Sequence, residues 1–67
     1  MYKYVRFFTD SKGEMTWDAV SDDRDLERRV VPSLPPAEQK IFTEKSELLE
    51  EMGGFILIGT CAIIRVA

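Results

Sequence analysis

Two stretches within the first twenty residues have the residue pattern of β-strands. Residues 2–9 are rich in aromatic side chains, and residues 14–20 place Met15, Trp17 and Ala19 on one face. The stretch between them, residues 10–13, consists of small, polar and glycine residues that favour turns. The pattern therefore predicts a β-hairpin.

A two-residue loop at Ser11-Lys12 would set the register of this hairpin. That loop places Arg6 opposite Trp17, where the guanidinium could lie over the indole as a cation–π pair. It also places Tyr4 on the same face of the sheet as Trp17.

Residues 37–52 have the period of an amphipathic helix. Their apolar positions recur with a spacing close to 3.6, and Gly53-Gly54 follows as a glycine C-cap. We expect one main helix here, with its apolar stripe buried: Ala37, Ile41, Phe42, Leu48, Leu49 and Met52.

Residues 55–66 are apolar at almost every position, which predicts a strand buried on both faces. Combined with the hairpin and the helix, this gives the order β-β-α-β. The predicted fold class is α+β: a small, three-stranded, mostly antiparallel sheet with one main helix on one face. The whole chain, residues 1–67, is predicted to form one domain.

One helix covers one face of such a sheet, so the second face needs another partner. The charged segment Ser21–Leu34 is the remaining part of the chain. It could cross the second face, anchored by its four apolar residues Leu26, Val30, Val31 and Leu34. Alternatively, the second face is an interface for another chain. The sequence leaves both arrangements open.

The composition restricts the chemistry of the chain. It contains one cysteine and no histidine, which excludes an intrachain disulfide and a tetrahedral Cys/His zinc site. Cys61 lies within an apolar strand with no base beside it, which is typical of a buried structural thiol. The acidic group Asp22, Asp23 and Asp25 lacks the later ligands of a calcium-binding loop. We therefore expect no enzymatic activity, no catalytic residue, no metal and no cofactor.

The location in the cell can also be predicted. No basic segment precedes an apolar one at the N-terminus, and the apolar run in residues 55–64 is too short to cross a bilayer. An unpaired cysteine fits a reducing compartment. A cytoplasmic protein without membrane contact is expected.

The charge is concentrated on the predicted helix. The chain has a formal net charge of −3, and the helix alone, with five glutamates and two lysines, carries that imbalance. An acidic chain is a poor candidate for non-specific nucleic-acid binding. We therefore expect a protein-binding module whose contact residues lie on an exposed sheet face and on the acidic helix face: Tyr2, Tyr4, Trp17, Glu44, Glu47 and Glu51.

The partner would be another protein or a second copy of the chain. In size and charge the sequence resembles the small acidic inhibitors that phages encode against host defence or transcription. That resemblance implies that its carboxylates occupy the nucleic-acid groove of an enzyme. The alternative function is nucleic-acid binding by the hairpin, through its aromatic side chains and the cations Lys3, Arg6 and Lys12.

Overall fold

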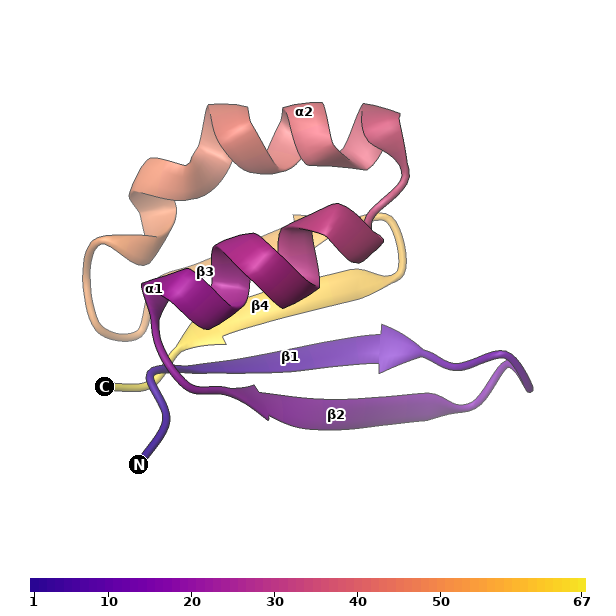
Figure 1. The fold of residues 1–67 in the computed structure, drawn as a ribbon, viewed down its shortest axis with the longest axis horizontal. Helices are drawn as coiled ribbons and strands as arrows, with labels where there is room; N and C mark the ends of the chain where they lie inside the picture. Colours follow the sequence, from indigo (N-terminus) through magenta and orange to yellow (C-terminus); the bar gives the residue numbers. More distant parts are fainter.

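Four antiparallel strands form one sheet in the order β2-β1-β4-β3 (Figure 1). The structure is a computed structural model and describes residues 1–67. The predicted α+β class is confirmed, but the sheet has four strands rather than three. The strands are β1 (Tyr4–Thr9), β2 (Met15–Val20), β3 (Phe55–Ile58) and β4 (Cys61–Arg65).

The first hairpin joins β1 and β2 through a loop longer than expected. The Asp10 carboxylate accepts hydrogen bonds from the backbone N–H groups of Lys12 and Glu14, at 2.8 and 3.0 Å. This loop sets a register in which Phe7 lies opposite Trp17 and Arg6 lies opposite Asp18. The predicted Arg6–Trp17 pair is therefore wrong. A register shift of one residue exchanges the faces of the strand, so Tyr4 and Trp17 point to opposite sides of the sheet.

The second hairpin replaces the long strand predicted for residues 55–66. Gly59 and Thr60 form a two-residue turn, in which Gly59 has a φ of 56°. Glycine at the first position of a two-residue turn suits the right-handed twist of a hairpin. The chain therefore reverses at this point, and Ile58 pairs with Cys61.

Two helical segments connect the hairpins, rather than the one main helix that was predicted. In the first segment the Asp22 carboxylate caps the helix by accepting from the Asp25 N–H at 2.8 Å. The second segment coincides with the predicted helix but ends three residues earlier in a 3₁₀ turn. The first segment comprises α1 (Asp23–Asp25), the π-helical turn η1 (Leu26–Val30) and the 3₁₀ turn η2 (Val31–Ser33); the second comprises α2 (Pro36–Lys45) and the 3₁₀ turn η3 (Ser46–Leu49).

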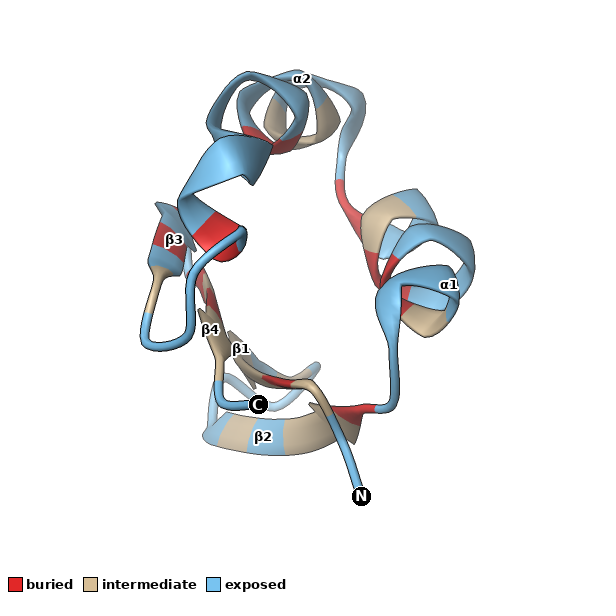
Figure 2. Ribbon diagram, turned by 90° about the vertical axis from the view of Figure 1, so that its left-hand side faces the viewer, coloured by how far each residue is buried: buried red, intermediate tan, exposed pale blue.

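Both helical segments pack on the same face of the sheet, as Figure 2 shows along the strands. We call this the covered face. The Ser21–Leu34 segment therefore does not cross the second face. The core that both segments close consists of Tyr4, Val20, Leu26, Val30, Leu34, Phe42, Leu49, Ile56, Ile58, Cys61 and Ile63.

None of the helices is both long enough and apolar enough to traverse a lipid bilayer.

Candidate functional site

The face of the sheet opposite the helices is apolar, and no part of the chain covers it. The strand registers align its side chains in two rows across the four strands. We call this surface the open face. One row is Trp17, Phe7, Ala62 and Leu57; the other is Ala19, Val5, Ile64 and Phe55, with Met15 and Thr9 beside the first row.

Four large side chains of the open face are strongly exposed. The exposed fraction is 68% for Met15, 64% for Leu57, 59% for Trp17 and 55% for Phe55. All four lie on the two edge strands, β2 and β3, whereas the apolar side chains of the central strands on this face are half-buried. Isolated exposed apolar side chains are common on protein surfaces, but a continuous group across a whole sheet face is typical of an interaction surface.

The open face carries no charged side chain, because the charged residues of these strands point to the other side. The Arg6 guanidinium donates two hydrogen bonds to the Asp18 carboxylate, at 3.0 and 2.8 Å. It also lies 4.3 Å from the centre of the Phe8 ring. Arg29 of η1 reaches the same carboxylate at 2.7 Å. These contacts link β1 and β2 to the first helical segment.

This network changes the pKa of Asp18. Its partial burial alone would raise the pKa, but the hydrogen bonds from Arg6 and Arg29 outweigh that effect and lower it. Asp25, which accepts from Arg29 and from the Ser21 N–H, has a pKa lowered to about 2. The carboxylates in this region are therefore held ionised by the structure.

Tyr4 does not belong to the open face, and its predicted placement beside Trp17 is wrong. Its side chain is only 4% exposed and lies on the covered face. Burial and the hydrogen bond that its hydroxyl donates to Asp23 raise the pKa of Tyr4 to about 12. Tyr2 precedes β1 and is 43% exposed. Of the three predicted aromatic contacts, only Trp17 lies on the open face.

The predicted acidic residues Glu44, Glu47 and Glu51 are all exposed, on or just after the second helical segment. All four salt bridges of the molecule use aspartates, so these glutamates keep their charges uncompensated. They lie on the helical side of the molecule and not on the open face. The structure therefore separates the two sets of predicted contact residues.

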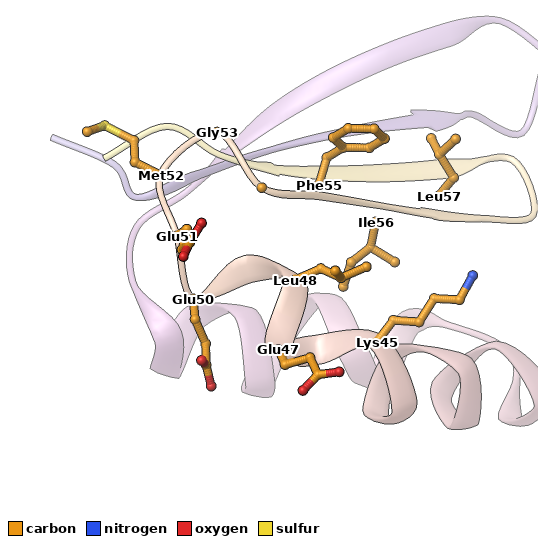
Figure 3. A pocket seen from close by; sticks show the side chains of 11 residues that line it. Lys45, Glu47, Leu48, Glu50, Glu51, Met52, Gly53, Phe55, Ile56 and Leu57 are labelled. Atoms are coloured by element: carbon orange, nitrogen blue, oxygen red, sulfur yellow. The ribbon is translucent and has the colours of Figure 1, made fainter.

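A groove of about 860 Å³ runs along the outer edge of β3, between this strand and η3 (Figure 3). Leu48 and Ile56 lie between the two elements, whereas Phe55 and Leu57 point away from η3 (Figure 3). Gly54 permits the close approach of η3 to the start of β3, since a Cβ atom there would lie 1.8 Å from the Leu48 carbonyl oxygen.

Cys61 belongs to the core, as expected from the sequence. Burial raises the pKa of its thiol, which disfavours the reactive thiolate. The aspartates of the first helical segment are used locally: Asp22 caps the helix, Asp23 binds Lys3 and Tyr4, and Asp25 binds Arg29.

Sequence reasoning missed Phe55 and Leu57 as members of the candidate surface. The prediction of one continuous strand placed them on the same face as Cys61, which is buried. Gly59 was the signal that could have found them, because glycine within an apolar run often marks a turn.

No protein-family model, curated protein or solved structure matches this chain.

Proposed function

We propose that this protein acts by binding another protein chain through its open face. The observation that carries the proposal is the position of both helical segments on the covered face, which leaves the opposite face apolar and without a partner. Aromatic residues and methionine are enriched in the cores of protein interfaces. The open face has this composition, with Phe7, Trp17, Phe55 and Met15.

The extent of exposed surface supports the proposal. The chain exposes 4674 Å², whereas a monomer of its 7.7 kDa mass should expose about 4,300 Å². Half-exposed aromatic side chains each leave on the order of 100 Å² in water. Together with the half-buried side chains beside them, these residues give the open face an exposed area close to roughly 600 Å². This is the area that each partner buries in the smaller stable interfaces.

The absence of charged side chains on the open face favours a protein partner over nucleic acid. Binding to phosphates requires lysine or arginine near the stacking rings. Of the three cations considered for nucleic-acid binding, Lys3 pairs with Asp23 and Arg6 pairs with Asp18. Only Lys12 has no acidic partner. The free, buried thiol of Cys61 fits a reducing compartment such as the cytoplasm.

A more specific form of this function is inhibition of a nucleic-acid-handling enzyme. In that case the unpaired Glu44, Glu47 and Glu51 would contact the basic groove of the enzyme. The open face would then hold a second copy or a further protein.

The test measures association of the wild type and of two matched variants. Trp17→Ser removes the largest side chain of the open face, and Ile41→Ser removes an exposed apolar side chain of α2 as the control. Sedimentation at micromolar concentration reports self-association, and capture from a lysate of the native host reports other partners. We expect Trp17→Ser to weaken the association by about 30-fold or more, and Ile41→Ser to leave it unchanged.

A wild-type chain that stays a 7.7 kDa monomer and captures no partner sensitive to Trp17→Ser would contradict the proposal.

A further inference from the structure

We propose that the outer edge of β3 binds an extended, basic segment of another chain as a fifth strand of the sheet. The proposal concerns the edge of the sheet rather than its open face. Phe55 and Leu57 belong to both surfaces, so the experiment includes a variant that separates them.

The register identifies the backbone groups available at this edge. A two-residue hairpin turn is closed by a hydrogen-bonded pair, here Ile58 and Cys61. Such pairs alternate along an antiparallel ladder, so Ile56 also bonds to β4. The N–H and C=O groups of Phe55 and Leu57 therefore point to the free edge, where an added strand could pair with them.

The groove along this edge provides sites for the side chains of such a strand. Successive side chains of a strand point to opposite faces. One set would lie against Leu48, which is 51% exposed. The other set would extend the open face beside Phe55 and Leu57 (Figure 3). This is the usual geometry of recognition by strand addition.

The opposite edge of the sheet, formed by β2, is capped by Arg29 near its C-terminal end. Arg29 donates a hydrogen bond to the Ala19 carbonyl oxygen at 2.9 Å and pairs with Asp18 through the same guanidinium. Charged side chains placed on an edge strand prevent pairing with other chains. β3 has no such contact, so its edge is the more accessible of the two to an added strand.

The charges around the groove select the type of segment. Glu47, Glu50 and Glu51 line it together with a single cation, Lys45. None of the three glutamates forms a salt bridge within the chain. A segment containing lysine or arginine is attracted to this wall. Pairing between two copies through β3 would bring the glutamates of both copies together, so a basic segment fits better than a second copy.

The experiment uses an acetylated peptide of sequence Lys-Val-Thr-Val-Thr-Val-Lys and a control peptide with glutamate at both ends. NMR measures the exchange of backbone amide hydrogens in the intact protein with and without each peptide. With the basic peptide, the exchange of the Phe55 and Leu57 amides should slow by about tenfold or more. The amides of Met15 and Trp17, on the β2 edge, should not change.

Two variants test the geometry and the charge separately. Leu57→Pro removes an outward N–H group but no bond to β4, and proline is tolerated on edge strands. It should weaken binding of the basic peptide by about tenfold. The double variant Glu50→Gln/Glu51→Gln keeps the backbone unchanged and should weaken binding several-fold, with a smaller dependence on salt. Trp17→Ser should bind the peptide like the wild type, even if it abolishes association through the open face.

Three results would overturn the proposal. The first is equal binding of the glutamate peptide. The second is that a folded Leu57→Pro variant and the double glutamine variant both bind the basic peptide as tightly as the wild type. The third is protection of the β3 amides in the free protein that increases with its concentration, which would identify a second copy as the occupant.

Discussion

The two faces of the sheet are both apolar, yet only one of them is covered. On the covered face, Ile56, Ile58 and Ile63 are at most 1% exposed. On the open face, Phe55 and Leu57 of β3 are more than half exposed. The two faces also differ in residue type. The fully buried side chains of the core are isoleucine and valine, whereas the most exposed side chains of the open face are methionine, leucine, tryptophan and phenylalanine.

This difference teaches that apolar content alone does not separate a core from an interface. Compact β-branched side chains fit the fixed packing between a sheet and its helices. Flat aromatic and flexible methionine side chains suit a surface that exchanges water for another chain. The composition of each face therefore agrees with its role in the proposed function.

The largest change in stability is expected from a matched pair of substitutions on β4. Ile63 lies on the covered face and Ile64 on the open face. Ile63→Ala should lower the free energy of unfolding by about 2–5 kcal/mol, because it leaves a cavity in the core. Ile64→Ala should lower it by about 1 kcal/mol in dilute solution, because its side chain is only half-buried. Urea unfolding at low protein concentration measures both. Equal losses would mean that the open face is already covered in the monomer.

A smaller effect is expected from the Asp18 network at the boundary of the covered face. Asp18→Asn should lower the free energy of unfolding by about 1 kcal/mol at neutral pH, because Arg6 and Arg29 lose their charged acceptor. The pKa values of Asp18, Asp23 and Asp25 are lowered in the folded state. Their contribution is therefore present above about pH 4 and is lost as the pH falls towards 2. Unfolding curves across this range should show a shallower decline for the variant than for the wild type.

The smallest change in the free energy of unfolding is expected at the two tyrosines, of which only Tyr4 is buried. Its raised pKa of about 12 means that the neutral hydroxyl stabilises the fold below pH 10. That stability is lost as the pH rises from about 10 to 12. Tyr4→Phe should lower the free energy of unfolding by less than about 1 kcal/mol and remove most of the alkaline decline. Tyr2→Phe is the control, and an equal response from it would argue against the burial of Tyr4.

Periodicity alone was sufficient to predict much of the fold. The alternation around Trp17 predicted the first hairpin, and the 3.6-residue spacing around Phe42 predicted the second helical segment. The apolar residues of the Ser21–Leu34 segment suggested packing on the sheet as one of two alternatives, and Leu26, Val30 and Leu34 are buried. They could not show on which face it packs, because an apolar anchor carries no information about the side of the sheet.

The errors about the candidate site arose in two turns. A loop one residue longer than expected moved Tyr4 and Arg6 to the covered face. A turn at Gly59 divided the last strand and placed Phe55 and Leu57 on the open face. The length of each turn sets the register of its two strands, and therefore decides which of their side chains share a face. Trp17 was placed correctly, because its strand keeps the predicted alternation with Met15 and Ala19.

The pairing of β1 with β4 has a consequence for how the molecule folds. Each hairpin closes over a few residues and can form early, but the two are joined only when the first strand meets the last. This contact spans nearly the whole chain, and contacts of such long range slow folding. During synthesis the ribosome must complete β4 before the sheet can close. Until then, the apolar β1–β2 hairpin has no partner strand, and exposed apolar strands of this kind are prone to aggregation.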